Sequence, residues 1–282
     1  MRADLHSHSS ASDGTCPPAE VMSRARAAGL DVIALTDHDT VAGHPGARAA
    51  LPPGLTLVPG MELSCRLDGR SVHLLGYLFD PDEPELAAEC ATIRSSRVDR
   101  ARAMVARLEE LGAPVSWEQV TAIAGDGVVG RPHIARALAA AGVVASAAEA
   151  FSPQWIGTGG RAHVRRYAPE PARAIELIRH AGGVAVLAHP RGDARAWIAS
   201  DQEIADLAAA GLTGIEVDHP DQDHAQRQRL RALAADLGLV ASGGSDDHGA
   251  LTGYRIGCDT ISAENYQRLA AQATGAAPVS GR

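Results

Sequence analysis

The stretch Asp31-Val32-Ile33-Ala34-Leu35-Thr36-Asp37-His38-Asp39 joins a short apolar run to three ionisable side chains. An apolar run of this length, bounded by polar residues, is typical of a strand buried on both faces of a parallel sheet. A helical pattern at residues 18–28 precedes it, and Gly29 is a typical stop signal for that helix. The stretch therefore predicts an α/β fold with chemistry at the strand's carboxyl end, where such folds carry their active sites.

The same alternation of apolar runs and helical patterns recurs along the chain. Further strands are predicted at residues 3–6, 56–58, 71–78, 184–188, 214–217 and 240–242. Repeated βα units predict a mostly parallel sheet or barrel. The middle of the chain instead has helical patterns at residues 86–111, 117–124 and 133–141. We therefore expect one barrel domain from residues 1–84 and 166–282, and a helical insertion at residues 85–165 that covers the active site.

Composition limits the classes of function. The formal net charge of −8 argues against sequence-independent binding to duplex nucleic acid, which favours a basic surface. The four cysteines are scattered without a C-x-x-C pair, which fits a reduced cytoplasmic protein. The N-terminus has no apolar signal stretch, and no run of 18 apolar residues predicts a membrane span. We expect a cytoplasmic protein that is a monomer or a small homo-oligomer.

Histidine and carboxylate residues recur near the ends of the predicted strands. His6 and His8 are two apart, so on a strand both imidazoles face the same side and can reach one ion. Taken singly, each position has an ordinary explanation, and a lone histidine such as His73 is more often a hydrogen-bonded core residue. Their joint recurrence favours a metal centre instead. The candidate ligands are His6, His8, Asp13, His38, Glu62, His73, His189, Asp246 and His248.

The mixed set of imidazoles and carboxylates limits the metal. Such a set suits Mn²⁺, Zn²⁺ or Fe²⁺ and disfavours Ca²⁺. The candidates exceed what one four- to six-coordinate ion can use, so we expect two or three divalent ions that share bridging groups. Clusters of this kind stabilise both the attacking and the leaving oxygen of a phosphoryl transfer and generate hydroxide near neutral pH.

These motifs together resemble the PHP (polymerase and histidinol phosphatase) family of metal-dependent phosphoesterases. The matching pieces are His6-x-His8, Ser12-Asp13-Gly14, Thr36-Asp37-His38-Asp39, Glu62, Ala188-His189-Pro190 and Gly244-Ser245-Asp246-x-His248. The resemblance implies a distorted, TIM-like (β/α)₇ barrel with metals at the carboxyl ends of the strands. It also implies three sites: His6, His8, Glu62 and Asp246 in one, Glu62, His73 and His189 in a second, and Asp13, His38 and His248 in a third. Asp37 and Asp39 would orient ligating imidazoles.

A helical insertion with the string Gly130-Arg131-Pro132-His133-Ile134 is similar to one branch of that family. Members of the branch remove phosphate from nucleoside 5′-monophosphates or 3′,5′-bisphosphates, and some degrade short RNA from the 5′ end. The resemblance makes Arg131 a phosphate clamp, because its guanidinium suits two phosphate oxygens.

Further substrate-binding candidates are His133, His219, Arg97 and Arg100. His219 has a second interpretation as a metal ligand. Arg97 and Arg100 share a helix face and could meet a second phosphate, although a solvated face explains them as well.

The expected activity is hydrolysis of a phosphate monoester by a metal-activated hydroxide. The substrate would be a nucleotide 5′-phosphate, a 3′,5′-bisphosphate nucleoside or short 5′-phosphorylated single-stranded RNA, with Mn²⁺ as the expected metal. One alternative is a histidinol-phosphate phosphatase, and another is a metal-dependent amidohydrolase. Amidohydrolases of this type usually use a carboxylated Lys, and the chain has no Lys. A non-catalytic metal-binding or nucleic-acid accessory module is a further alternative.

Overall fold

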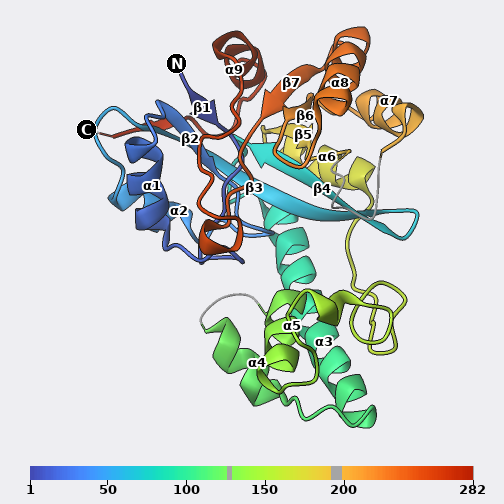
Figure 1. Ribbon diagram of the computed structural model, residues 1–282. Helices are drawn as coiled ribbons and strands as arrows, with labels where there is room; N and C mark the ends of the chain where they lie inside the picture. The colour runs from blue at the N-terminus through green and yellow to red at the C-terminus, as the bar shows by residue number, and fades with distance from the viewer. Residues whose placement is uncertain (126–128, 192–198, 282) are drawn as a thin grey trace. The chain divides into compact units, whose positions relative to one another are not determined.

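A computed structural model describes residues 1–125, 129–191 and 199–281. Its sheet contains, in spatial order, β1 (Ala3–Asp4), β2 (Val32–Leu35), β3 (Thr56–Leu67), β4 (Arg70–Tyr77), β5 (Val184–Leu187), β6 (Gly214–Asp218) and β7 (Val240–Gly243). The short strand β8 (Val279–Ser280) pairs with β3 outside this order. Figure 1 shows these strands with helices on their outer side. The predicted α/β barrel is confirmed.

Most neighbouring strands are parallel, but β4 is antiparallel to both β3 and β5. The turn between β3 and β4 consists of Asp68 and Gly69, which both have positive φ angles, of 49° and 80°. An Asp-Gly pair with two positive φ angles is the preferred two-residue hairpin turn. The hairpin extends β3 to residue 67, beyond the predicted strand at residues 56–58.

The sheet is nearly closed. The backbone N–H of Leu5 donates to the carbonyl of Gly243 at 3.4 Å, and Ser7 forms a parallel bridge with Asp247. These contacts join the segment after β1 to the segment after β7. As a result, the carboxyl ends of strands far apart in the sequence surround one centre.

Six helices belong to the barrel portion. They are α1 (Pro18–Ala27), α2 (His44–Ala49), α6 (Pro171–His180), α7 (Asp201–Ala209), α8 (His224–Asp236) and α9 (Ala263–Ala270). Helix α6 packs against β4 and β5, and α8 packs against β6 and β7 (Figure 1). Helices α2, α7 and α9 were not predicted. Between the helices and the sheet lie apolar clusters made largely of Ala, Val, Leu and Ile, as the low aromatic content of 3% requires.

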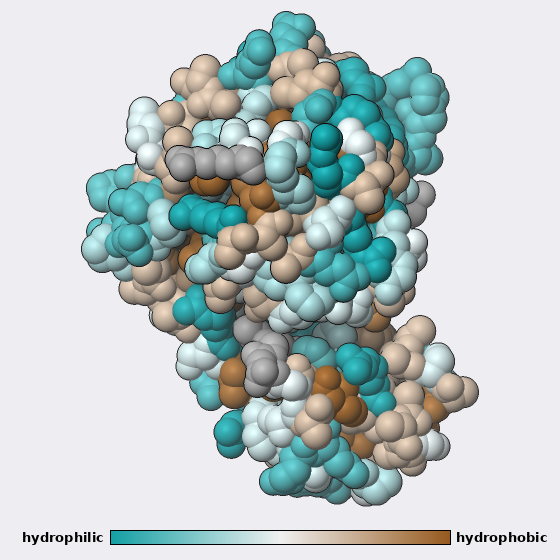
Figure 2. Space-filling view, turned by 90° about the vertical axis from the view of Figure 1, so that its left-hand side faces the viewer, coloured by the Kyte–Doolittle hydropathy of each residue, from teal (hydrophilic) through white to brown (hydrophobic). Residues whose placement is uncertain are grey.

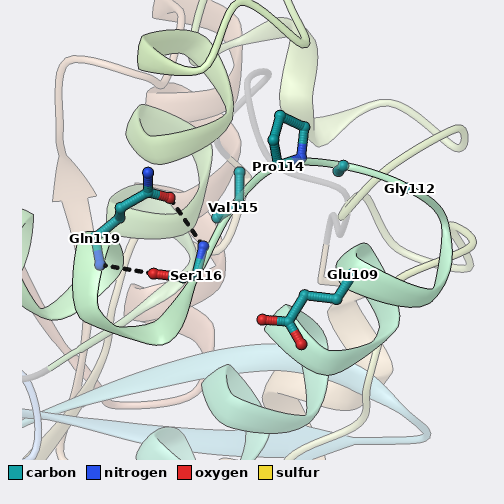
Figure 3. A pocket seen from close by; sticks show the side chains of 7 residues that line it. Glu109, Gly112, Pro114, Val115, Ser116 and Gln119 are labelled. Carbon is teal, nitrogen blue, oxygen red and sulfur yellow. Dashed lines mark hydrogen bonds between the residues drawn. The ribbon is translucent and has the colours of Figure 1, made fainter.

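The chain divides into two compact units, residues 1–90 with 168–282 and residues 91–167. The second unit contains the larger part of α3 (Pro84–Glu110), together with α4 (Trp117–Ala124), α5 (Arg131–Ala140) and the 3₁₀ turn η1 (Glu149–Phe151). It has a core of its own, which includes Met104, Leu108 and Leu138. The start of α4 is fixed by a reciprocal cap, in which Ser116 N–H donates to Gln119 Oε1 at 2.9 Å and Gln119 N–H donates to Ser116 Oγ at 3.3 Å (Figure 3).

In the part of the chain that the structure describes, no helix combines the length and the apolar character needed to cross a membrane. The face drawn in Figure 2 carries its hydrophobic residues in small groups among hydrophilic ones. The large apolar side chains that are exposed, among them Leu251, Tyr254 and Phe151, are few and belong to different segments. Singly exposed apolar residues of this kind are ordinary for a globular surface.

Candidate metal centre

Each of the seven main strands places at least one imidazole or carboxylate at a common centre. His6 and His8 follow β1, and His38 follows β2 and forms an isolated parallel bridge with Glu62 in β3. The antiparallel strand β4 carries His73 within its length, opposite Ser64 of β3. The remaining strands contribute His189 after β5, Glu216 and His219 at the end of β6, and Asp246 and His248 after β7.

Glu62 lies at the middle of this arrangement and is 1% exposed. Its Oε2 atom is 3.3 Å from His6 Nε2, 3.1 Å from His8 Nε2 and 3.3 Å from His38 Nδ1. Its Oε1 atom is 2.7 Å from His73 Nδ1 and 2.9 Å from His189 Nε2. Five imidazoles therefore face one carboxylate, divided between its two oxygens, as a bridging ligand requires.

Two aspartates extend the cluster on either side of His8. Asp246 Oδ1 is 3.2 Å from His6 Nε2 and 3.3 Å from His8 Nε2. Asp13 Oδ1 is 3.3 Å from His248 Nε2, and Asp13 Oδ2 is 3.6 Å from His38 Nε2. All nine residues predicted as metal ligands thus converge, although their positions in the sequence run from 6 to 248.

Several of these contacts have the spacing of ligands that share an ion rather than of hydrogen bonds. Within the described residues, His6 Nε2 and His8 Nε2 are buried and form no hydrogen bond, despite carboxylate oxygens at 3.1 to 3.3 Å. Two atoms that ligate one ion at about 2.1 Å lie about 3.0 to 3.4 Å apart in octahedral or tetrahedral geometry. The donor set and its spacing therefore fit divalent metal ions.

The possible ligand sets overlap. Ligand atoms lie within 4.8 Å of one another in four groups: His6, His8, Glu62 and Asp246; His38, Glu62 and His73; His8, Asp13, His38 and His248; and His6, Glu216 and His219. The first group matches a predicted site residue for residue. The third group contains all three predicted members of another site and adds His8. More than one ion can be held, because Glu62 and His38 each belong to two groups.

Charge within the cluster is strongly coupled. Burial alone raises the pKa of Glu62 and of Asp246, but nearby imidazoles outweigh burial and hold both values well below the usual range. Burial lowers the pKa of His8, yet Asp246 and Glu62 outweigh it and raise the pKa to about 10. The carboxylates are therefore anionic near neutral pH, and protons occupy the imidazoles when no metal does.

Asp37 and Asp39 hold the loops that carry the cluster. Asp37 accepts hydrogen bonds from the N–H of Ser9 at 2.8 Å and from the hydroxyl of Ser12 at 2.7 Å. Asp39 accepts from the N–H and hydroxyl of Ser64 at 2.7 and 2.9 Å. These hydrogen bonds go to serines, whereas we predicted that both carboxylates orient imidazoles. Their geometry instead fixes the segment before Asp13 and the strand that carries Glu62.

Glu216 is a residue of the centre that the sequence analysis did not select. It is 1% exposed, and its Oε1 atom lies 3.0 Å from His6 Nδ1. A charged residue inside the apolar run Gly214-Ile215-Glu216-Val217 was the available signal, because a buried carboxylate requires partners. Arg255 was also missed, and its Nη2 donates to the backbone carbonyl of Asp246 at 3.0 Å.

His219 lies beside Asp246, with its Nε2 atom 3.3 Å from Asp246 Oδ2. Its Nδ1 atom accepts a hydrogen bond from the N–H of Asp221 at 3.0 Å. An accepting Nδ1 leaves the ring proton on Nε2, so His219 donates toward Asp246. This tautomer disfavours His219 as a metal ligand and leaves it a hydrogen-bond donor at the centre.

The other substrate-binding candidates, Arg131, His133, Arg97 and Arg100, lie in the unit formed by residues 91–167. The guanidinium of Arg131 lies 5.5 Å from the centre of the Phe151 ring. Burial, followed by the neighbouring charge of Arg97, lowers the pKa of Arg131. Within the described residues, Arg131 has no carboxylate partner. His133 caps helix α5, because its Nδ1 accepts from the N–H of Gly130 at 3.0 Å.

The same unit contains a pocket lined by residues 109, 112–116 and 119 (Figure 3). Glu109 is the single ionisable side chain in that lining. A lone carboxylate does not make a metal site or an acid–base pair. The chemistry-bearing residues are those of the barrel cluster.

Comparison with known proteins identifies the class. Residues 4–112 match the PHP domain model. The chain is 38% identical over 248 residues to a 5′-3′ exoribonuclease of Haemophilus influenzae, covering 87% of this chain and 89% of that protein. It is 35% identical over 254 residues to a 3′,5′-nucleoside bisphosphate phosphatase of Chromobacterium violaceum, covering 89% of each.

A solved structure from Bifidobacterium adolescentis, assigned to the metal-dependent phosphoesterases, superposes with a TM-score of 0.87 at 32% identity and covers 96% of each chain. The chain therefore belongs to the PHP family. It is a metal-dependent phosphoesterase, as the ligand cluster and the sequence motifs indicate.

Proposed function

We propose that this phosphoesterase removes the 5′-phosphate of a nucleotide, of a 3′,5′-bisphosphate nucleoside or of short 5′-phosphorylated single-stranded RNA. The observation that carries the proposal is the cluster around Glu62, in which five imidazoles face one carboxylate. Relatives named as a 5′-3′ exoribonuclease and a 3′,5′-nucleoside bisphosphate phosphatase support the substrate class.

We assign the nine predicted ligands to two or three divalent ions, with Mn²⁺ as the preferred metal. Imidazole and carboxylate ligands together suit Mn²⁺, and Zn²⁺ or Fe²⁺ fit the same donors. When bound, such ions supply positive charge for the phosphoryl oxygens and a nucleophile at neutral pH. The protein's contribution is to hold the ligands, bind the substrate and place hydrogen-bond donors.

Arg131 is the proposed phosphate-binding residue. Its half-buried guanidinium has no carboxylate partner among the described residues and lies near a second cation, Arg97. Two neighbouring cations in a partly desolvated place favour binding of a dianion such as a phosphate. His133, Arg97, Arg100 and His219 remain proposed substrate contacts. In this proposal the helical unit covers the active site, which brings Arg131 to the scissile phosphate.

The charge of the helical unit supports a substrate with more than one phosphate. Residues 91–167 contain ten Arg against six Asp or Glu, a net charge of +4 in a chain whose total is −8. A local excess of Arg attracts short polyanions, whereas the overall negative charge opposes binding to long duplexes. We therefore propose single-stranded RNA or small nucleotides as substrates and exclude duplex nucleic acid.

The proposed location is the cytoplasm, and the proposed assembly is a monomer or a small homo-oligomer. Cys16, Cys65, Cys90 and Cys258 are free thiols. Free thiols are ordinary in a reducing compartment.

A substrate panel with Mn²⁺ tests the proposal. It compares 5′-AMP, a 3′,5′-bisphosphate nucleoside, a 5′-phosphorylated RNA tetramer, histidinol phosphate and a set of amides, with 3′-AMP as a matched control for phosphate position. We expect phosphate release from the 5′-phosphorylated compounds and little from 3′-AMP. Preferred turnover of histidinol phosphate or of an amide would contradict the proposal and favour one of the alternative enzymes.

A further inference from the structure

Glu216 is a buried carboxylate that contacts two of the proposed ligands from different strands. It is in β6, and its side chain is almost fully buried. Its Oε1 atom is 3.0 Å from His6 Nδ1, and its Oε2 atom accepts the backbone N–H of His189 at 2.8 Å. His6 follows β1 and His189 follows β5, so one side chain connects two separate segments of the barrel.

The contact with His6 determines which ring nitrogen faces the cluster. A carboxylate next to Nδ1 keeps the proton on that nitrogen, so the lone pair of the neutral ring is on Nε2. His6 Nε2 is the atom that lies 3.3 Å from Glu62 and 3.2 Å from Asp246. Glu216 therefore both aims the ring and selects the tautomer that can ligate an ion.

The contact with His189 holds an unusual backbone. His189 has a φ angle of +30°, in the region that residues with a Cβ rarely adopt. The hydrogen bond from its N–H to Glu216 anchors this conformation. In it, His189 Nε2 reaches Glu62 Oε1 at 2.9 Å. Without the anchor, the backbone could relax and move the imidazole away from Glu62.

The end of β6 is itself braced. The side-chain amide of Gln222 donates to the backbone carbonyl of Glu216 at 3.2 Å and to that of Val217 at 2.8 Å. Glu216 therefore projects from a backbone with little freedom to move. A rigid support is needed if one carboxylate is to keep two ligands in register.

We propose that Glu216 is a positioning residue that couples two metal sites, holding the ring of His6 for one ion and the backbone of His189 for another. The inference rests on the proposed ligand set for His6 and His189. It predicts that Glu216 affects how tightly metal binds without ligating metal itself.

The rival interpretation is that Glu216 ligates a further ion with His6 and His219, whose potential ligand atoms lie within 4.8 Å of each other. The hydrogen bonds argue against it. His6 would have to bind metal through both ring nitrogens, and His219 Nδ1 already accepts from Asp221 N–H. Both oxygens of Glu216 are also engaged, one by each partner.

The test compares Glu216→Gln and Glu216→Ala with the wild-type protein and with Asp218→Asn. Asp218 lies in the same strand, but its carboxylate pairs with Arg231 at 2.7 Å, so it is a matched control. Glutamine keeps the shape and presents one oxygen and one NH₂ group, so it can accept from only one of the two partners. Each metal-free protein is titrated with Mn²⁺, and bound Mn²⁺ is counted by elemental analysis.

For Glu216→Gln we expect a 10- to 100-fold weaker Mn²⁺ affinity, the usual effect of losing a partner that orients a ligand. The saturated ion count and the circular dichroism of the metal-free protein should match wild type. With Mn²⁺ saturating, kcat should fall while KM for 5′-AMP stays constant, because the residue acts through ligand geometry. Glu216→Ala should weaken affinity further, and Asp218→Asn should behave as wild type.

Three outcomes overturn the inference. Wild-type affinity in both Glu216 variants would show that neither contact positions a ligand. A saturated count lower by one ion, with the others bound as in wild type, would make Glu216 a ligand. Failure of the wild-type protein itself to take up Mn²⁺ would refute the proposed ligand set and this inference with it, and only that outcome involves the wild-type protein.

Discussion

Among single residues, Arg131 is where the proposed substrate recognition can be tested most directly. Its guanidinium is half-buried, lies against Phe151 and has no carboxylate partner in the described part of the chain. A cation of this kind costs free energy to bury unless an anion joins it. A bound phosphate would provide that anion.

We predict that Arg131→Ala lowers kcat/KM for 5′-AMP by about 100-fold, the usual cost of removing one charged donor from a phosphoryl or oxyanion site. Mn²⁺ content should not change, because Arg131 is not among the proposed ligands. Arg136→Ala is the control, since Arg136 is exposed on the same helix. Steady-state kinetics and elemental analysis check the prediction, and loss of metal in Arg131→Ala would show that its role is misassigned.

The residues of the metal centre differ in how well the sequence predicts them. His38 and His189 directly follow apolar strands, and a histidine there has few structural explanations. Glu216 has an equally visible signal, a carboxylate within a buried strand, but its role depends on partners more than 20 residues away. Asp37 shows the opposite error, because neighbouring serines rather than imidazoles are its partners.

At the scale of elements, the junction between the segments after β1 and β7 closes the barrel and sets the position of His6. Gly244 follows β7, and a Cβ atom there would lie 2.4 Å from His6 Cβ and 2.6 Å from His6 N. Real side chains do not approach so closely, so one backbone would have to move. The absence of a side chain at residue 244 therefore determines how closely the two segments approach.

We predict that Gly244→Ala destabilises the protein by about 1–3 kcal/mol, the usual cost of overpacking, and weakens Mn²⁺ binding because His6 shifts. Gly46→Ala is the matched control. Its Cβ would lie 3.6 Å from the nearest atom, in Pro18, and Ala favours helix α2, so we expect a gain of about 0.4–1 kcal/mol. Urea unfolding and Mn²⁺ titration measure both effects. Wild-type Mn²⁺ affinity in Gly244→Ala would contradict this account.

Strand positions follow from local pattern more reliably than strand directions do. The apolar runs located β2, β5, β6 and β7 because burial on both faces leaves a continuous apolar signature. The antiparallel hairpin of β3 and β4 was missed, although Asp68-Gly69 is its turn signal. Helices α2 and α7 are short, which weakens any periodic signal.

Across the whole molecule, the metal centre connects segments from both ends of the chain. Ligands lie after β1 near the N-terminus and after β7 near the C-terminus. Ions bound among them stabilise the folded state by linkage, about 2.7 kcal/mol for one site at a free concentration 100 times Kd. Metal therefore acts as a cross-link that only the closed barrel can form.

We predict that chelation lowers the Tm of the protein and that Mn²⁺ restores it, with a gain that increases from pH 6 to pH 8. Carboxylates outweigh burial and raise the pKa of His8 to about 10. In metal-free protein this proton stabilises the fold fully below pH 6.5, and that contribution is lost as pH rises through about 10. Mn²⁺ competes with the same proton, so its advantage grows with pH.

Differential scanning calorimetry with and without a chelator measures this gain at each pH. Glu62→Gln is the control that should lose it, because Glu62 faces five imidazoles. A Tm gain that is the same at pH 6 and pH 8, or one retained in Glu62→Gln, would contradict the prediction.

The amino-acid sequence by itself determined the α/β barrel, the helical insertion's presence and the residue types that surround the metal centre. These are local properties, since strand burial, helix periodicity and the chemistry of a strand's last residue need few neighbours. Only the tertiary structure decided which atoms share a site. The division of five imidazoles between the two oxygens of Glu62, and the link from His6 to Glu216, arise when barrel closure brings together residues up to 210 positions apart.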